Sequence, residues 1–297
     1  MVAYPHLSSE QQQDLPKLIQ VTALPVMYED STHQLWQCDT FQDQLILKIC
    51  SSDQVDKSTF WQGMANLFDV NLPKQLGKID QAYETVTTLS QLAIPEYISS
   101  GSSSPQTHAF ILATKLPGAM VTNIEVDDDM VISLANHIGD LHQQEQKKWG
   151  RFYQADFDSQ KWPLRLQDTL IALAENQSMI ATELLDEVID LAANCTVDNF
   201  VPIMPDLRWD QFLQQNSSLS ALVDLDAFVY GPRELELVLL EYLLDEQQAN
   251  LFAEHYQKNH SLPDLTQVRK PYRLLLFMMN VLGEKNIDNW MQASTRF

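Results

Sequence analysis

The feature that most constrains this chain is a pair of acidic segments within residues 204–226. Asp206 follows the apolar run 200–204, and Asp224 closes a second apolar stretch, 221–223. Gln211 lies five positions after Asp206, so the first segment carries both an acid and an amide. Proteins that transfer phosphoryl groups use this order to hold a hydroxyl and a magnesium ion around a phosphate. Phosphoryl transfer is therefore the leading hypothesis.

Composition and charge narrow the class of protein. The chain has 297 residues and 45% hydrophobic content, enough to bury one large core or two smaller ones. It carries 19 basic and 40 acidic residues, a formal net charge of -21, and such a surface repels nucleic-acid phosphates and anionic lipids. We expect no nucleic-acid partner. The same field attracts an amine-bearing substrate, although an acidic balance is equally explained by solubility.

Cysteine usage and hydropathy indicate where the protein works. Cys38, Cys50 and Cys195 are odd in number and lack the spacing of a metal site, which is typical of reduced thiols. The first residues do not form a basic region followed by an apolar run, and the strongest apolar run, 274–279, is too short to cross a bilayer. We expect a soluble, cytoplasmic protein without a membrane partner. Its oligomeric state cannot be read from the sequence.

The order of apolar patterns predicts an α+β chain with a small strand-rich part, residues 1–115, and a larger helical part, residues 116–297. The first part is expected to hold helices over 9–19, 60–76 and 79–92, and strands over 25–28, 34–38, 44–49, 97–99 and 108–113. The second is expected to hold helices over 130–148, 161–176, 180–194, 233–257 and 266–282, interrupted by strands near Asp206 and Asp224. Residues 115–118 form a hinge between the two parts.

The chemistry of phosphoryl transfer assigns roles to these residues. A carboxylate at Asp206 can orient an incoming hydroxyl and accept its proton. Asp224 can ligate magnesium through a hard oxygen, and the amide of Gln211 can supply a second oxygen. Lys48, near the end of an apolar strand, can neutralise phosphates if a helical acid such as Glu84 holds it in place.

In their order these residues resemble the aminoglycoside phosphotransferase and choline kinase family, including its fructosamine kinase-like branch. Residues 45–48 look like the lysine strand of the family, and residues 111–118 look like its hinge. Asp206 falls where the family has His-Gly-Asp, and Asp224 with Asp226 matches its metal-binding pair. The likeness covers nearly the whole chain. It implies a bilobal, protein-kinase-like fold and an ATP- and magnesium-dependent kinase acting on a small-molecule hydroxyl, with nucleotide contacts from the hinge at Ala113 and Lys115.

Departures from the family pattern leave a second hypothesis open. Met204-Pro205 replaces His-Gly, and Gln211 replaces an asparagine and is one methylene longer. No glycine precedes Gly63, so the first turn lacks a Gly-rich phosphate cradle and Ser31, Thr32 and His33 are expected to serve instead. A catalytically impaired, pseudokinase-like binding or regulatory protein fits these features, as does an enzyme of this fold that moves another group, such as a nucleotide.

For several other polar residues a structural role is the alternative to a functional one. Carboxylates at 127–129 precede a helix and are expected to cap it. Glu234 and Glu236 are expected to anchor the loop of Asp206 from the helix that follows. His142 lies on an amphipathic helix and is expected to be a packed residue rather than a ligand. Gln211 has a structural alternative as well, as a loop amide that satisfies backbone groups.

Overall fold

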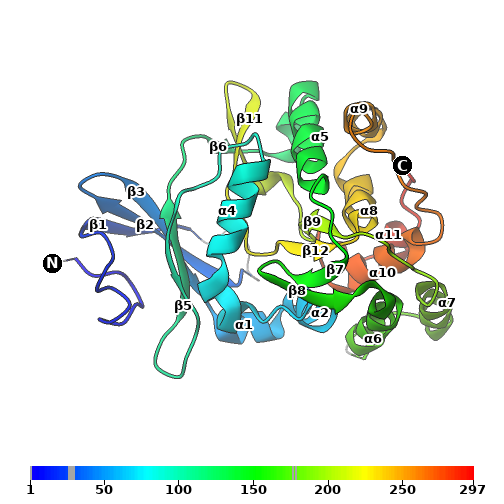
Figure 1. The fold of residues 1–297 in the computed structure, drawn as a ribbon, viewed down its shortest axis with the longest axis horizontal. Helices are drawn as coiled ribbons and strands as arrows, with labels where there is room; N and C mark the ends of the chain where they lie inside the picture. Colours follow the sequence, from blue (N-terminus) through cyan, green and yellow to red (C-terminus); the bar gives the residue numbers. More distant parts are fainter. Residues whose placement is uncertain (1, 26–30, 176, 178) are drawn as a thin grey trace.

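The molecule consists of an antiparallel sheet and a mainly helical part, and helix α4 (Asp80–Leu89) lies between them in the view of Figure 1. This computed structural model describes residues 2–25, 31–175, 177 and 179–297. The sheet has the strand order β1-β2-β3-β5-β4, and each neighbouring pair is antiparallel. The α+β class predicted from the sequence is confirmed. The strands of this sheet are β1 (Leu18–Ala23), β2 (His33–Thr40), β3 (Gln44–Cys50), β4 (Tyr97–Gly101) and β5 (Ala109–Thr114).

The strands expected over 34–38, 44–49, 97–99 and 108–113 are all present in this sheet. The first expected strand, 25–28, lies almost wholly outside the described residues. The first strand of the structure is β1, which occupies the end of the region where we expected a helix over 9–19. That prediction is wrong: residues 9–14 form turns, and Pro16 lacks the backbone donor that a helix would need there.

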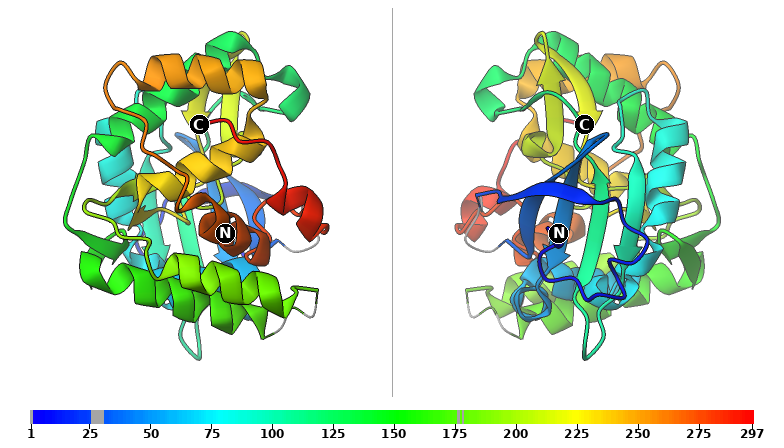
Figure 2. Two further views of the ribbon diagram at one scale, coloured as in Figure 1. Left: turned by 90° about the vertical axis from the view of Figure 1, so that its right-hand side faces the viewer. Right: turned by 90° about the vertical axis from the view of Figure 1, so that its left-hand side faces the viewer.

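The N-terminal turns cover the outer face of the five-stranded sheet (Figure 2). Alternation along β3 explains this arrangement, because Leu45, Leu47 and Ile49 point to one face and pack there with Tyr4 and other apolar residues. Lys48 belongs to the opposite face of the same strand. Since β3 is the central strand of the sheet, pairing with β2 and β5 on both sides fixes Lys48 toward the helical part.

Helices build most of the remaining chain, and one large core joins them to the inner face of the sheet. In chain order they are α1 (Ser52–Lys57), α2 (Thr59–Phe68), α3 (Leu72–Gln75), α4 (Asp80–Leu89), α5 (Asp128–His142), α6 (Trp162–Ala174), α7 (Thr182–Ala192), α8 (Arg233–Leu243), α9 (Glu246–Tyr256), α10 (Arg269–Met278) and α11 (Ile287–Met291). Short 3-10 turns are η1 (Leu76–Lys78), η2 (Asn123–Glu125), η3 (Ser159–Lys161) and η4 (Trp209–Gln211).

The expected helices that form are all somewhat shorter in the structure, and three of them end or divide well inside their predicted ranges. The helix over 60–76 ends at Phe68, because Asp69 takes a left-handed conformation with φ of 61°. The helix over 130–148 ends at His142, and its expected last residue, Lys148, instead begins a strand. The helix over 233–257 is two helices, because Leu244 is extended and Asp245 caps α9 through a hydrogen bond from Gln248 N.

Two smaller sheets hold the acidic segments in place. One has the strand order β8-β7-β12-β9 and the other β11-β10-β6. Asp206 follows β9, and Asp224 follows β11, so both carboxylates lie just beyond a strand end. The strands of the two sheets are β6 (Ala119–Met120), β7 (Lys148–Arg151), β8 (Gln154–Asp158), β9 (Val201–Ile203), β10 (Phe212–Gln215), β11 (Ser218–Leu222) and β12 (Val229–Gly231).

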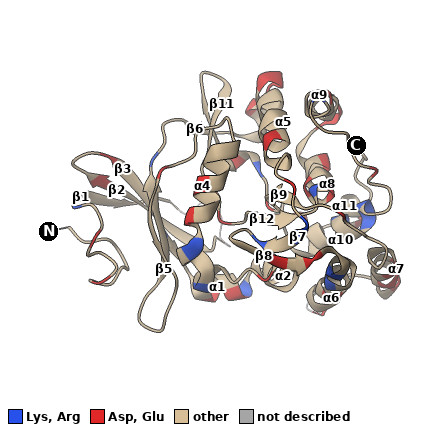
Figure 3. Ribbon diagram, in the orientation of Figure 1, with Lys and Arg blue, Asp and Glu red and all other residues tan. Residues whose placement is uncertain are grey.

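Two further expectations concern cysteines and membranes. Cys38, Cys50 and Cys195 are free and buried, as expected for reduced thiols. Within the described part of the chain, no helix combines the length and the apolar character needed to cross a membrane. Acidic residues are spread along α5, α7 and α9 in Figure 3.

Candidate active site

Two cavities meet between the five-stranded sheet and the helical part. The smaller, of about 360 Å³, is lined by the inner face of the sheet and by the hinge. The larger, of about 570 Å³, lies beside the end of α10 and the start of α2. Four residues line both cavities and so mark where they join: Ser31, His33, Arg208 and Asp224. The acidic segments predicted to form the site therefore lie at this junction.

Lys48 reaches from β3 to the segment that follows β11. Its ammonium donates a hydrogen bond to Asp224 Oδ1 at 2.6 Å, and it lies 3.3 Å from Asp226 Oδ2. Burial alone would lower the pKa of Lys48, but Asp224 and Asp226 outweigh burial and raise this pKa above its ordinary value. Burial likewise opposes ionisation of Asp224, yet Lys48 holds the pKa of Asp224 below its usual range. Lys48 is therefore charged, and it bridges the two acids.

Glu84, which we expected to hold Lys48, does not do so. Its side chain is exposed on α4, whereas the neighbouring Tyr83 is 4% exposed and lines the smaller cavity together with Lys48. Adjacent helical residues point in directions about 100° apart, so only one of the two can face the cleft. The partners of Lys48 among the described residues come instead from the helical part of the molecule.

Asp206 lies in the turn between β9 and η4 and lines the larger cavity only. Its Oδ2 accepts a hydrogen bond from Gln211 Nε2 at 3.3 Å, while Oδ1 is buried without a hydrogen-bond partner in the described part of the chain. Burial, reinforced by Asp224, raises the pKa of Asp206 to about 7. Such a carboxyl exchanges its proton near neutral pH, which is the range in which a general base operates.

Gln211 is part of the scaffold of this turn. Its Oε1 accepts a hydrogen bond from the backbone N–H of Arg208 at 2.9 Å, and its Nε2 donates to the backbone oxygen of Asp206 at 3.1 Å. The side chain is 3% exposed. The geometry thus matches the structural alternative, in which a buried amide satisfies backbone groups, and does not direct the amide oxygen toward a metal.

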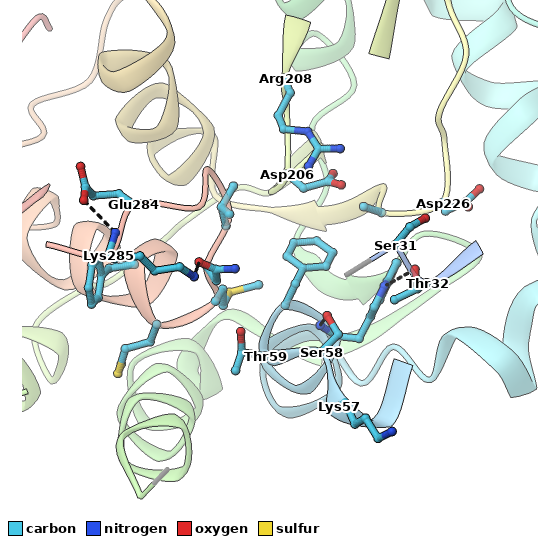
Figure 4. Close-up of a pocket in the computed structure, with 18 of the residues that line it drawn as sticks. Ser31, Thr32, Lys57, Ser58, Thr59, Asp206, Arg208, Asp226, Glu284 and Lys285 are labelled. Carbon is cyan, nitrogen blue, oxygen red and sulfur yellow. Dashed lines mark hydrogen bonds between the residues drawn. The ribbon is translucent and has the colours of Figure 1, made fainter. Parts of the chain in front are cut away.

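His33 and Asp226 connect the sheet to the junction. Nε2 of His33 lies 3.4 Å from Asp226 Oδ2, and Nδ1 lies 3.2 Å from the hydroxyl of Thr32. Burial lowers the pKa of His33, which favours the neutral ring. Burial also raises the pKa of Asp226. Among the expected phosphate-facing residues, Ser31 and His33 line both cavities and Thr32 lines the larger one. Figure 4 shows this wall with Ser31 and Thr32 below Asp226.

The turn of Asp206 is anchored from α8. Glu236 Oε1 accepts a hydrogen bond from the backbone N–H of Met204 at 2.7 Å, and Oε2 lies 2.9 Å from His142 Nε2. Nδ1 of His142 lies 2.8 Å from the hydroxyl of Tyr256, so three helices contribute to the anchor. The anchoring role expected for Glu236 and the packed role expected for His142 are confirmed. Glu234 instead lies 3.9 Å from its neighbour Arg233 and does not contact the turn.

The hinge residues Ala113 and Lys115 both line the smaller cavity. Sequence reasoning missed two other lining residues, Tyr83 and Arg208. For Tyr83 the signal is indirect, since a helix-spacing count back from Leu89 lands at the neighbouring Ala82 rather than at Glu84. For Arg208 the signal is its position two residues after Asp206, which keeps it in the same turn. Capping at 127–129 is confirmed by Asp127, whose side chain accepts a hydrogen bond from Met130 N at 2.9 Å.

Magnesium and a nucleotide are the groups that the sequence resemblance implies for this site. In the described part of the chain no three His, Cys, Asp or Glu side chains cluster as a metal site. Magnesium in phosphoryl-transfer sites, however, needs only one or two carboxylates because substrate phosphates supply further oxygens. Asp224 and Asp226 meet that need, and Asp226 Oδ1 is buried without a hydrogen-bond partner among the described residues. The donor set therefore fits a hard cation that arrives with phosphates.

Comparisons of the sequence find neither a matching protein family nor a curated relative. Solved structures do resemble the chain. A protein assigned as a fructosamine-3-kinase from Haemophilus somnus 129PT has a TM-score of 0.62 at 15% identity, covering 96% of this chain and 92% of that chain. A macrolide 2'-phosphotransferase from Brachybacterium faecium has a TM-score of 0.58 at 11% identity, with 98% and 95% covered.

An aminoglycoside phosphotransferase solved with GDP and kanamycin also superposes, with a TM-score of 0.56 at 15% identity and with 95% of this chain and 92% of that chain covered. Identities this low carry the fold and not the chemistry. The chain therefore has the bilobal, protein-kinase-like fold of these fructosamine kinase-like and aminoglycoside phosphotransferase structures, as the sequence resemblance predicts.

Proposed function

We propose that this protein is an ATP- and magnesium-dependent phosphotransferase that phosphorylates a hydroxyl group of a small molecule. The observation that carries the proposal is the junction of two cavities at Asp224, with Asp206 on the side of the larger one. A nucleotide in the smaller cavity would end its phosphate chain where an acceptor in the larger cavity begins. Structures of the same fold were solved with GDP and kanamycin, and with AMP-PNP and hygromycin B, which supports the proposal that a nucleotide and a second small molecule bind together.

The smaller cavity suits a nucleotide base and sugar. Its walls include Leu35, Ile46 and Ile111 from the sheet and Leu213 from β10, which together provide apolar surface for a flat ring. Ala113 and Lys115 close it along the hinge. In this proposal residues 1–115 form the nucleotide-binding lobe, and residues 116–297 supply the catalytic and acceptor side.

In the proposed reaction the acceptor oxygen forms a bond to the γ-phosphorus, while the bond from that phosphorus to the bridging oxygen of ADP breaks. The proton of the acceptor hydroxyl passes to the carboxylate of Asp206. The turn held by Gln211 and Glu236 keeps this carboxylate in position before the acceptor arrives. Positioning of this kind supplies much of the rate enhancement in phosphoryl transfer.

Lys48, Asp224 and Asp226 form the charged part of the proposed site. Asp224 and Asp226 are the carboxylates that would hold magnesium, which when bound neutralises charge on the phosphate oxygens. The ammonium of Lys48 lies within 3.3 Å of both acids, so in this proposal it can turn from them to the nucleotide phosphates while it stays in the cleft. The expectation that Gln211 also serves the metal is not part of this proposal, because its oxygen is used by the backbone of Arg208.

The larger cavity suggests which acceptors to test. Phe60, Trp61 and Phe277 give it an aromatic wall, and its outer rim carries Lys57 and Lys285 as well as Glu284. This rim does not select a cation, so an amine group is not required of the acceptor. We propose an acceptor that combines a hydroxyl with an apolar ring or chain, since aromatic walls favour apolar contact.

The test is a phosphorylation assay with ATP and magnesium against amino sugars, amino alcohols, glycated amines and neutral hydroxyl compounds with apolar groups. Product mass and phosphorus NMR identify the transferred group, which also detects transfer of a nucleotide. We expect Asp206→Asn to lower turnover by about 10²–10⁴-fold while nucleotide affinity stays within about threefold. Unchanged turnover in Asp206→Asn would show that Asp206 is not the base.

A second candidate function is a pseudokinase-like protein that binds a nucleotide without turning it over. It is favoured by the pairing of Lys48 with Asp224 and by the use of the Gln211 oxygen within the turn. Calorimetric titration with ATP, with and without magnesium, separates the candidates. Tight magnesium-dependent binding that Asp224→Ala abolishes, together with turnover, supports the enzyme; binding without turnover across the whole acceptor panel supports the second candidate.

A further inference from the structure

We propose that a hydrogen-bonded relay of three side chains positions the carboxyl group of Asp226, one of the two acids that would hold magnesium. The relay consists of Trp61, Thr32 and His33, and its role rests on the proposed function. These three residues and Asp226 all line the larger cavity. Trp61 belongs to α2, Thr32 directly precedes β2, and His33 is the first residue of β2. The relay therefore joins the aromatic wall of the larger cavity to the proposed metal site.

The chemistry of Trp61 fixes the direction of the first hydrogen bond. Its indole Nε1 can only donate, so the hydroxyl oxygen of Thr32, at 3.3 Å, is the acceptor. The hydroxyl proton of Thr32 is then left to be donated. Nδ1 of His33 lies 3.2 Å from the same oxygen, and a dashed line marks this contact at Thr32 in Figure 4. Thr32 can therefore accept from the tryptophan and donate to the histidine.

The opposite side of the His33 ring gives the same assignment. Nε2 lies 3.4 Å from Asp226 Oδ2, and the ammonium of Lys48, which can only donate, lies 3.3 Å from that same oxygen. Oδ2 is therefore an acceptor, and a lone pair on Nε2 would repel it. A neutral histidine ring carries one proton, so this proton lies on Nε2 while Nδ1 accepts from Thr32. Burial lowers the pKa of His33, in agreement with a neutral ring.

The N–H of His33 remains available in the free protein. Its Nε2 and the Oδ1 of Asp226 are both buried without a hydrogen-bond partner in the described part of the chain. In the proposed function Lys48 turns to the nucleotide phosphates, so Oδ2 of Asp226 loses that neighbour. His33 can then hold Oδ2 through a hydrogen bond, which leaves Oδ1 for the metal ion. Carboxylates that ligate metals are held by such hydrogen bonds, and loss of the partner weakens metal binding.

The first measurement compares Thr32→Val and Thr32→Ser with the wild type by calorimetric titration with ATP, with and without magnesium. Valine keeps the shape of threonine without its hydroxyl, whereas serine keeps the hydroxyl. We expect Thr32→Val to reduce the gain in ATP affinity from magnesium by about tenfold, with ATP affinity in the absence of magnesium within about threefold, and Thr32→Ser to restore most of the gain. Thr59→Val is the matched control, because Thr59 lines the same cavity outside the relay, and it should keep the gain.

The second measurement needs neither nucleotide nor metal. Nitrogen-15 NMR of protein labelled at its seven histidines reports the protonated ring nitrogen, and His33→Gln assigns the signals of His33. We expect a proton on Nε2 and none on Nδ1 in the wild type and in Thr59→Val, and a mixture of the two tautomers in Thr32→Val.

A proton on Nδ1 of wild-type His33 overturns the relay, also where Thr32→Val does not fold. An unchanged magnesium effect in folded Thr32→Val overturns it as well. Either result leaves the proposed phosphotransferase standing. A wild type that binds ATP more tightly with magnesium but transfers no phosphoryl group defeats only the proposed function, whereas ATP binding that does not respond to magnesium defeats both.

Discussion

At the scale of single residues, the environment of Asp206 sets its protonation. The side chain sits in a turn where Oδ1 is buried without a hydrogen-bond partner in the described part of the chain, and its pKa is raised to about 7. The folded protein therefore binds the proton of Asp206 more tightly than the unfolded chain does. Stability contributed by the protonated form is present at low pH and is lost as pH rises from the unfolded pKa toward about 7.

This gives the first prediction, that Asp206→Asn stabilises the protein more at high pH than at low pH. Asparagine has the shape of the protonated acid and cannot ionise, so its advantage should grow by on the order of 1 kcal/mol between about pH 5.5 and about pH 8. Thermal denaturation at the two pH values measures it. Asp158→Asn, on an exposed position of β8, serves as the control and should show no such trend. A variant equally stable or less stable than the wild type at about pH 8 contradicts the prediction.

At the scale of secondary structure elements, the anchor formed by α8, α5 and α9 fixes the turn of Asp206. Glu236 is 1% exposed and holds both the Met204 N–H and the His142 ring. Removing it leaves two buried groups without their acceptor, which is among the costlier kinds of substitution. The turn of Asp206 therefore depends on a helix that does not line the two cavities.

We predict that Glu236→Ala lowers the free energy of unfolding by about 3 kcal/mol and that Glu236→Gln, which retains one acceptor oxygen, costs less. Denaturant titration measures both changes. Glu234→Ala on the same helix is the control, because the partly exposed Glu234 side chain lies no nearer than 3.9 Å to Arg233 in its ion pair, and its loss should cost less than about 1 kcal/mol. A cost for Glu236→Ala no larger than that of the control rules out the anchor.

Some secondary structure elements were predictable from the sequence and others were not. The strands over 34–38 and 44–49 were predictable because alternation of apolar residues reports directly on a half-buried sheet. The prediction of a helix over 9–19 was wrong because it rested on the apolar spacing alone, whereas Pro16 lacks the backbone N–H that a helix needs at that position. The split of 233–257 into α8 and α9 was missed because both halves share one apolar pattern, and only Asp245 with Gln248 marks a new helix start.

The candidate site was predictable where order along the chain was enough. Asp206 and Asp224 each follow an apolar strand, and the structure brings both to the larger cavity. The side chain of α4 that faces the cleft beside Lys48 was not predictable, because choosing between Tyr83 and Glu84 requires the rotation of α4 against the sheet. Arg208 was missed because lining two cavities at once is a property of the packed lobes and leaves no trace in the residue pattern.

At the scale of the whole molecule, the net charge of -21 opposes compaction through repulsion among acidic residues. Salt screens this repulsion over about 8–10 Å, so we predict that Tm rises as NaCl is increased from about 20 mM to about 200 mM. A gain in the free energy of unfolding on the order of 1 kcal/mol corresponds to a Tm increase of about 2–4 °C for chains of about 150–250 residues. Scanning calorimetry provides the measurement, with an uncharged osmolyte of equal osmolality as the control. A Tm that falls or stays constant in added salt would count against the repulsion.

The ion pair between Lys48 and Asp224 has a consequence for the sequence of events in the cleft. In the resting protein one ammonium engages an oxygen of each of two acids, so a bare divalent cation meets carboxylates that are already compensated. In the proposed function a triphosphate would offer Lys48 further oxygens and so would release Asp224 and Asp226 for the metal ion. The lysine ammonium thus takes the place of the metal ion in the free protein. We expect that the protein does not bind magnesium at millimolar concentration unless a nucleotide is bound as well.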